Sequence, residues 1–469
     1  MKFFILTAFV FSVSLLFSQS QKVGVNEPNP AVTLDVNGSV KIGNDNNNSS
    51  PAGTIRFNPE TGDFEGFDGN EWVTLSPNPQ DLFWPSIGNR GVASNYYAAS
   101  PADAVQGDGF GFAVAMDGLY AAIGSPYWSS YKGRVHIYKR EPAFGFWNLV
   151  QVLEGQSAGE QMGFSVALSG NKLVVGLPGA NNNFGKALIF SRIGTVWNLE
   201  TSLTPGNSNH KRFGHDVDID GEKIVVSSPD PNPSGGLNEG LVWIYHFSAP
   251  SVYTVSVVST PHSMPFGENM FGFAVGISGE WLAVSAPFHN DDTGIDSDSV
   301  YIFHQDTGNE YTHTQSLSGP EKHDQFGYSL AINESVLVIG SRNESTLPAF
   351  SSNGACRGYF LDNGVWQQNY QCRATGDFAF FGNSVSTTSD LSILSSINAV
   401  GPVSPLVKIM KKENGTFASY LNIEDPAATA SDHMVHAVAI SSNYFVIGIP
   451  YGESLNGLTG GRVYFGRVR

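Results

Sequence analysis

The residues best suited to chemistry form an acidic segment in the middle of the chain. Asp291, Asp292, Asp296 and Asp298 fall close together, on either side of Gly294. Carboxylate oxygens on a flexible turn suit Ca²⁺, because this hard cation takes about six to eight oxygen ligands. The segment therefore predicts either a calcium site or a solvated acidic loop, which clustered charges also commonly form.

The two cysteines of the chain could form a disulfide. Cys356 and Cys372 fall on consecutive apolar stretches that flank the turn Asn363-Gly364-Val365. A three-residue loop would place residue 362 opposite 366 and, in the same register, Cys356 opposite Cys372, so that both side chains leave one face of a sheet. In an oxidising compartment this predicts a disulfide, and the alternative is a pair of buried thiols.

Motifs of covalent or metal-dependent catalysis are missing from the sequence. It contains no Gly-x-Ser-x-Gly elbow, no His-Glu-x-x-His and no phosphate-binding glycine loop. Neither cysteine has a histidine close to it in sequence. Because catalytic sites can be assembled from distant segments, this absence lowers the expectation of an enzyme without excluding one.

The elements that position these residues belong to a repeat. Seven copies of one pattern begin with an aromatic residue or Met, usually followed by Gly, and continue into an alternating apolar stretch and a Gly-x-Pro-like turn. Successive starts lie 51 to 58 residues apart, with a mean of 54. A period near fifty, built from short strands and turns, is typical of propeller blades and not of helical arrays. The copies begin at Phe110, Met162, Phe213, Phe271, Phe326, Phe381 and Met434.

Each copy predicts four antiparallel strands. In the second copy they cover residues 163–168, 172–176, 186–190 and 197–203, because apolar residues recur there at every second position. Tight turns such as Ser169-Gly170-Asn171 join them, where Gly supplies positive φ. The predicted fold is therefore all-β, a seven-bladed β-propeller of four-stranded antiparallel blades, preceded by a small β-meander region.

The last copy lacks a fourth strand, because the sequence ends directly after its third, residues 462–467. Fourth strands of complete copies lie 15 to 18 residues before the next copy. Counting back from Phe110 gives residues 95–100, which we expect to pair with 462–467. This closure would remove an exposed edge that could otherwise aggregate.

The N-terminal part predicts an exported protein with a small β-module. Residues 1–20 have the charge, apolar run and small residues of a signal peptide. Residues 21–76 contain short strands and a three-strand meander, too small to bury a core alone, so a stalk or a homo-oligomer contact is expected. Residues 77–91, with Pro77, Pro79 and Pro85, predict a linker to the ring, residues 92–469.

Composition and charge narrow the classes of partner and the cellular location that we expect for the protein. The chain is 41% hydrophobic and 14% charged, with 52 Gly, which suits a turn-rich sheet protein. Its net charge of −17 repels phosphate backbones and argues against nucleic acid. No later stretch is apolar over the roughly 20 residues that a membrane span needs. We therefore expect a secreted or cell-surface protein without a transmembrane segment.

The copies resemble FG-GAP repeats, which form the seven-bladed propellers of integrin α-subunits and of many secreted bacterial proteins. The resemblance covers residues 95–469 and rests on segments such as Met162-Gly163-Phe164-Ser165-Val166-Ala167 and on turns such as Gly124-Ser125-Pro126. Three copies depart from it, at Gly340-Ser341-Arg342, Ser395-Ser396 and Met434-Val435. Residues 23–75 also resemble a short module that precedes display domains in bacterial surface and fibre-like proteins.

The family resemblance implies a place to look for calcium. Integrin-type blades often carry Asp-x-Asp-x-Asp-Gly between their first two strands, and residues 216–221 fit these letters. The acidic residues alternate with Val217 and Ile219, however, at positions that are strand in the other copies. A calcium loop needs a curved backbone, so we expect an acidic strand edge here and take the segment around Asp292 as the better calcium candidate.

The loops that join second to third strands, and one copy to the next, emerge on one face of the ring, where propellers usually bind. Exposed aromatic rings beside amides suit carbohydrate or protein surfaces. The alternative is that these aromatics fold over the tops of the blades. The candidate ligand-binding residues are Tyr127, Trp128, Tyr131, Asn182, Asp230 and Asn232.

Two functions follow from these observations. The favoured one is a non-catalytic binding or adhesion propeller for an extracellular protein or glycan, with calcium as the one suggested cofactor. The alternative is a secreted hydrolase or lyase acting on polysaccharide or peptide through carboxylates such as Asp216 and Asp218. A paired site needs carboxylates from two copies about 5 to 10 Å apart, and only the third copy is acidic there.

Overall fold

A computed structural model describes two parts of the chain. The chain divides into two compact units, Met1–Pro77 and Asn78–Arg469. The described residues are 23–25, 34–36, 54–58, 63–67, 72–74, 96–141, 146–206, 210–231, 240–249, 252–261, 270–288, 298–306, 308–321, 324–344, 353–373, 380–396, 406–413, 415–424, 435–451 and 460–468. The predicted signal peptide and linker lie outside them.

The first unit contains two small sheets. Strands β1 (Val23–Val25) and β2 (Leu34–Val36) pair in parallel. Strands β3 (Ile55–Asn58), β4 (Asp63–Phe67) and β5 (Trp72–Thr74) form an antiparallel meander.

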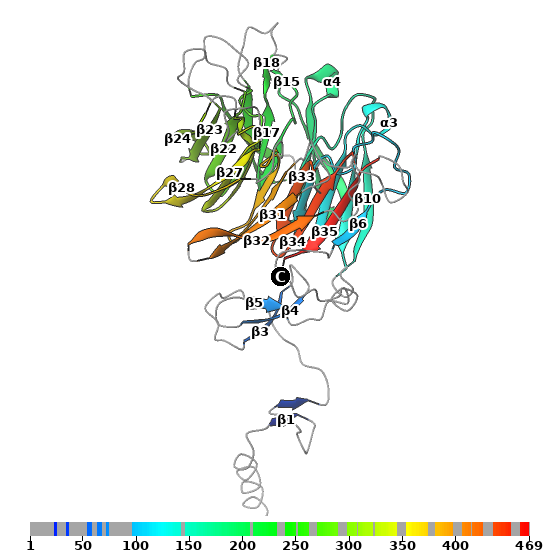
Figure 1. Cartoon of the computed structure of the whole chain (residues 1–469). Coiled ribbons are helices and arrows are strands. Elements are labelled where there is room, and N and C mark those ends of the chain that lie inside the picture. Colours follow the sequence, from blue (N-terminus) through cyan, green and yellow to red (C-terminus); the bar gives the residue numbers. More distant parts are fainter. Residues whose placement is uncertain are drawn as a thin grey trace, which may run out of the picture. The chain divides into compact units, whose positions relative to one another are not determined.

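The second unit is a seven-bladed propeller (Figure 1). Each blade is a four-stranded antiparallel sheet, and we number the blades one to seven in chain order. Their strands are β7 (Val114–Asp117), β8 (Tyr120–Ser125), β9 (Arg134–Arg140) and β10 (Trp147–Glu154) in blade one; β11 (Ser165–Ser169), β12 (Lys172–Leu177), β13 (Lys186–Ile193) and β14 (Val196–Leu203) in blade two; β16 (Val217–Asp220), β17 (Lys223–Ser228), β19 (Leu241–Ala249) and β20 (Val252–Val258) in blade three; β21 (Val275–Ser278), β22 (Trp281–Ala286), β23 (Ser299–Gln305) and β24 (Tyr311–Ser318) in blade four; β25 (Phe326–Asn333), β26 (Val336–Ser341), β27 (Ala355–Asp362) and β28 (Val365–Arg373) in blade five; β29 (Val385–Thr387), β30 (Leu391–Ser395), β31 (Leu406–Glu413) and β32 (Thr416–Glu424) in blade six; and β33 (Ala437–Ser441), β34 (Tyr444–Ile449) and β35 (Arg462–Arg467) in blade seven.

The seventh blade is completed from the other end of the propeller. Its fourth strand is β6 (Tyr96–Ala99), which pairs antiparallel with β35, with Ala99 opposite Val463 and Tyr96 opposite Gly466. This is the closure expected from the spacing of the copies. In addition, Trp147 of blade one stacks on Phe465 of β35, with ring centroids 4.5 Å apart. The ring is thus joined both by backbone pairing and by side-chain packing.

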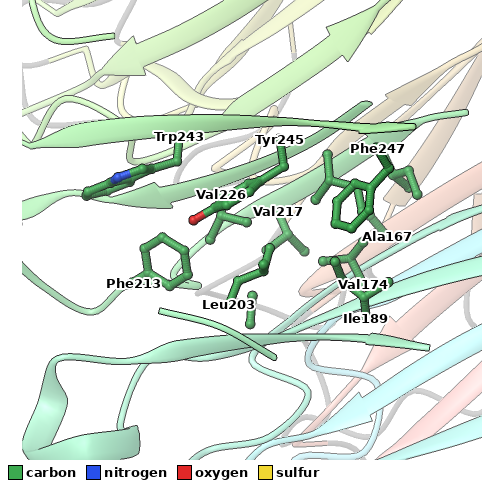
Figure 2. Close-up of a cluster of buried hydrophobic side chains, with 13 residues drawn as sticks. Ala167, Val174, Ile189, Leu203, Phe213, Val217, Val226, Trp243, Tyr245 and Phe247 are labelled. Atoms are coloured by element: carbon green, nitrogen blue, oxygen red, sulfur yellow. The ribbon is translucent and has the colours of Figure 1, made fainter. Parts of the chain in front are cut away.

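The hydrophobic core lies between neighbouring blades. Seven clusters of buried side chains each combine residues from two adjacent blades. Figure 2 shows the cluster between blades two and three, where Ile189 and Leu203 of blade two face Phe213 and Trp243 of blade three. Successive side chains of a strand point to opposite faces, and the middle strands are apolar at consecutive positions such as Leu173 to Val175. Both faces of a blade therefore carry core residues, and each sheet packs on two neighbours.

The repeated glycines allow adjacent blades to touch through their backbones. A Cβ added to Gly124, in the turn of blade one, would lie 2.0 Å from the carbonyl oxygen of Gly163 in blade two. Gly176 and Gly214 meet in the same way between blades two and three, at 2.1 Å. The glycine of the Gly-x-Pro-like segment and the glycine that follows a repeat start therefore meet in the contact between neighbouring blades.

The cysteine pair is joined by a disulfide, and its Cα atoms lie 5.3 Å apart. Cys356 lies opposite Cys372 as expected, but the register at the turn differs from the prediction. Asp362 pairs with Val365, because Asn363 (φ 49) and Gly364 (φ 80) alone form a two-residue hairpin. A bulge at Asn369, opposite Gly358 and Tyr359, then shifts the register by one residue and restores the expected pairing of the cysteines.

Candidate functional site

One position of the repeat places seven side chains around the axis of the ring. It lies two residues after the conserved aromatic or Met, where the chain enters the first strand of each blade. Because the seven blades form a closed ring, equivalent residues at this position encircle its axis. We call this set the collar; it consists of Phe112, Phe164, His215, Phe273, Tyr328, Asn383 and His436.

The collar residues contact one another from blade to blade. Ring centroids are 5.0 Å apart for Phe112 and Phe164, and 5.4 Å for Phe164 and His215. The series continues from His215 to Phe273 and from Phe273 to Tyr328, at 5.1 Å each. Side chains that pack edge to edge in this way form one continuous aromatic surface.

The collar continues on the other side of Phe112. His436 stacks on Phe112, with centroids 4.1 Å apart, and its Nδ1 donates to the carbonyl oxygen of Phe112 at 2.7 Å. Asn383 donates from Nδ2 to the carbonyl oxygen of His436 at 3.1 Å. Five of the seven residues are half-buried, whereas His215 and Asn383 are buried. The aromatic surface is therefore partly open to solvent.

The two collar histidines are neutral at physiological pH. Burial lowers the pKa of His215 to about 3, and the positive charge of Arg212 acts in the same direction. Burial also lowers the pKa of His436 to about 4. Aromatic, amide and uncharged imidazole groups thus make up the collar.

Two arginines supply the charge beside it. The Arg212 guanidinium lies 5.4 Å from the ring centroid of Phe164 and 3.6 Å from an oxygen of Asp230. The Arg342 guanidinium lies 4.7 Å from the ring centroid of Tyr328, and its Nη1 donates to the Tyr328 hydroxyl at 2.8 Å. It also lies 5.2 Å from the ring centroid of Phe380 in blade six. Arg342 therefore bridges blades five and six, between the two ends of the series of collar contacts.

The backbone at the lead-in to the collar is left-handed in every blade where it is described. Gly109 occupies this position in blade one, but Gln161, Arg212 and Phe380 have φ of 59, 62 and 43 without being glycine. Such residues pay about 1 kcal/mol or more for this conformation.

Two of the predicted ligand residues lie next to the collar. The ring of Tyr127 is 5.3 Å from that of Phe112 and 5.4 Å from that of Tyr131. Tyr131 is 54% exposed, so the two tyrosines extend the aromatic surface outwards. Both belong to the segment before and within the short helix α3 (Trp128–Tyr131), on the loop side of the ring (Figure 1).

The other predicted ligand residues are less closely joined to it. Trp128 covers the guanidinium of Arg134 at 4.7 Å, which corresponds to the alternative of an aromatic folded over its blade. Asp230, in β18 (Asp230–Pro231), pairs with Arg212 beside the collar. Asn182 is exposed in α4 (Ala180–Asn183), and Asn232 lies outside the described residues.

Of the four predicted calcium ligands, only Asp298 is described. It is 1% exposed, and its carboxylate accepts the backbone N–H of Gln325 at 2.7 Å. Burial raises its pKa to about 6. It stands where blades one, two and three have Gly133, Gly185 and Gly240, so its side chain serves the junction with blade five. Asp291, Asp292 and Asp296 lie outside the described residues.

Asp216 and Asp218 connect blades three and four. Asp216 accepts the N–H of Val275 at 2.8 Å, and Asp218 accepts the N–H of Ile277 at 2.7 Å. Burial is the main cause that raises the pKa of each to about 7. A fraction of each residue's surface stays accessible, although protein atoms surround both carboxylates. The segment is the strand β16, as its alternation with Val217 predicted.

Serines make the equivalent bonds between blades six and seven. Ser384 accepts the N–H of Val438 at 3.1 Å, and Ser386 accepts the N–H of Ile440 at 3.2 Å. In the remaining blades these positions hold only Ala, Gly or Ser. No carboxylate of a second blade therefore joins Asp216 and Asp218 at these positions.

Sequence reasoning missed the collar and the two arginines. It searched the long loops, whereas the collar is formed by residues just before the first strand of each blade or, for Tyr328, within that strand. The signal was present as a column of Phe, Phe, His, Phe, Tyr, Asn and His, two residues after each repeat start. Arg342 was noted only as a departure from Gly-x-Pro.

The comparisons with known proteins agree with this fold. The family described as FG-GAP repeat matches residues 267–303, which begin before blade four and reach into β23. A search of the curated proteins finds no match. Within the described ranges, no group of three His, Cys, Asp or Glu residues is placed to hold a metal ion, and no helix is long and apolar enough to cross a membrane.

Proposed function

We propose that this chain, a seven-bladed propeller whose residues 267–303 match the FG-GAP repeat, is a secreted, non-catalytic binding protein that holds an extracellular ligand over the collar. The observation that carries the proposal is the convergence of collar side chains from all seven blades on one axis.

The chemistry of the collar favours binding. Partly exposed aromatic rings offer a large apolar contact area at low cost in side-chain entropy, and they are the groups on which interfaces concentrate their binding energy. Tyr328 and the arginines add hydrogen-bond donors that can fix the orientation of a ligand. The rings are already packed against one another, so little order has to be gained on binding.

Export and display are part of the same proposal. Residues 1–20 have the pattern of a signal peptide, and the Cys356–Cys372 disulfide suits an oxidising compartment. The strands of the first unit are short, and we propose that this unit acts as a stalk or as a contact between copies of the chain.

The arrangement of the carboxylates speaks against the alternative of a glycoside hydrolase. Asp216 and Asp218 come from one strand, and both accept backbone N–H groups of the next blade. Glycosidases need one carboxyl group on each side of the scissile bond. We therefore assign these two residues to the junction between blades.

A ligand screen tests the proposal. The full-length protein is applied to arrays of glycans and extracellular proteins, with and without calcium. For any ligand found, Phe164→Ala and Phe273→Ala should weaken binding by about ten-fold or more, because each removes part of the aromatic surface. Leu199→Ala, on the outer strand β14 where Leu199 is 54% exposed, is the matched control. Equal binding by the collar variants and the control would refute the proposal.

A further inference from the structure

We infer that Arg342 anchors a carboxylate-binding subsite at the edge of the collar, and that the ligand is a protein segment presenting one carboxylate beside an apolar side chain. The inference rests on the proposed function and specifies its ligand.

Among the described residues, the guanidinium of Arg342 is held in place by uncharged groups. It contacts the rings of Tyr328 and Phe380, and its hydrogen bond within the described ranges goes to the Tyr328 hydroxyl. Its Nε is buried and has no hydrogen-bond partner there. A guanidinium carries five N–H donors in a planar fork that matches a carboxylate. Most of this donor capacity therefore has no partner in the part of the chain that the structure describes, on a group that is already oriented.

Several other arginines of the propeller face an acid, although Arg192 instead binds Asn171 and the ring of Tyr120. Arg134 binds Asp103 with two hydrogen bonds of 2.7 and 2.9 Å, and Arg357 binds Glu344 in the same bidentate way. Arg212 lies against Asp230. No carboxylate lies within 4.0 Å of Arg342 in the described part of the chain. An external carboxylate would supply the missing partner, and charge-assisted bidentate pairs are the strong class of hydrogen bond.

The surroundings of Arg342 select the rest of the ligand. The collar beside it is aromatic, and its histidines are neutral, so an apolar group next to the carboxylate would find matching surface. The chain carries a net charge of −17, which repels a polymer with a negative charge on every unit. A single acidic group flanked by apolar residues satisfies both conditions, and a protein segment provides it more readily than an acidic polysaccharide.

Ligand-observed NMR titrations of the full-length protein test the inference. The probes are N-acetyl-L-phenylalanine, its uncharged amide and trigalacturonate. We expect the acid to bind about ten-fold more tightly than the amide, because one charge-assisted pair is worth roughly that factor. Arg342→Gln should abolish the difference. The matched control is Arg467→Gln, since Arg467 also lies over a tyrosine ring, that of Tyr444 at 5.5 Å, but at the far end of β35.

Each outcome of the titrations supports or overturns one part of the inference. Equal binding of acid and amide by the unsubstituted protein, binding of neither, or an unchanged preference in Arg342→Gln would overturn the subsite. If trigalacturonate binds through Arg342 and the acid does not, the ligand is an acidic glycan and the protein segment is wrong. Loss of acid and amide binding alike in Phe164→Ala, with no preference for the acid, would leave the collar as a binding site and remove only the carboxylate. A thermal melt of each variant checks that it folds.

Discussion

Replacing Asp216 and Asp218 by serine should make the propeller less sensitive to pH. The pKa of each carboxyl group is about 7 in the folded protein, against an ordinary value of 3.8. Between these values the folded state binds protons that the unfolded state has released. The stabilisation is therefore complete below about pH 4 and is lost as the pH rises through 7.

The size of the effect follows from the shift. One pKa unit corresponds to about 1.4 kcal/mol, and the step from pH 8 to pH 5 spans about two of the three units, or ~2.7 kcal/mol for each carboxyl group without screening. Because both residues keep some accessible surface, we expect about 1 kcal/mol each. For a ring of this size the pair should then shift the melting temperature by about 3 °C.

Serine is a suitable replacement because the chain already uses it. Ser384 and Ser386 accept the corresponding N–H groups between blades six and seven, so the double variant Asp216→Ser/Asp218→Ser keeps an uncharged acceptor at both places. Calorimetry at pH 5 and pH 8 should show a smaller difference between the two melting temperatures than in the unsubstituted protein.

A control variant tests whether the pH dependence comes from burial of the carboxylates or from the hydrogen bonds that they accept. Asp220 accepts the N–H of Gly279 at 2.6 Å, at the exposed turn of the same strand. Asp220→Ser should leave the pH dependence as it is. If the double variant keeps the full pH dependence, or if Asp220→Ser removes it, burial of Asp216 and Asp218 is not its cause.

Four further predictions concern the ring. Deleting residues 96–99 should cost about 3 to 5 kcal/mol, since four cross-strand pairs at about 1 kcal/mol each are lost, and an unchanged thermal melt would contradict the closure. Cys356→Ala/Cys372→Ala should destabilise the protein by about 3 kcal/mol, the value for a loop of this length. The intact mass of the unsubstituted protein, measured without reduction, should be lower by two hydrogens than the mass of its thiol form. Gly124→Ala should cost about 2 kcal/mol or more in chemical denaturation, because its Cβ would lie 2.0 Å from the Gly163 oxygen, whereas Gly170→Ala, where no atom lies within 4 Å of the added Cβ, should cost only the strain of its positive φ. If the acidic segment binds calcium, calorimetric titration with calcium should give heat that disappears in Asp292→Ala and Asp296→Ala, because carboxylates are its expected ligands; no heat with the unsubstituted protein would end the calcium hypothesis.

The fold was predictable because two periods coincide in the sequence. Alternation as in Val166 and Leu168 gives the strands, and the mean spacing of 54 residues gives the blades. Closure by β6 followed from counting, since a blade without its last strand leaves an open edge. These features depend on the backbone and on the burial of apolar groups, which sequence patterns express directly.

Finer geometry was predicted less well. The Cys356–Cys372 pair was expected from a three-residue turn, whereas a two-residue turn and a bulge at Asn369 together produce it. A bulge leaves no clear mark in a single sequence, because the extra residue only has to fit locally. The cysteines pair as expected because two register shifts of one residue each, at the turn and at the bulge, cancel.

The collar could not be recognised from residue type. Phe112, His215 and Asn383 occupy one position with three different chemistries, and each alone reads as an ordinary strand residue. What unites them is their place on a common axis, and that depends on how far the ring turns from one blade to the next. Arg342 stands where other copies have the Pro of Gly-x-Pro. Comparing the copies therefore shows only a missing Pro, although the Arg342 guanidinium bridges blades five and six.

Because β6 pairs with β35, the ring can close only after β35 has been synthesised. Ala99 is synthesised hundreds of residues before its partner Val463. Until then the first blade has no neighbour on one side, and Trp147 has no Phe465 to cover it. A chain that stops before β35 would therefore leave apolar side chains of blades one and seven exposed, and only a chain that extends through β35 can bury them.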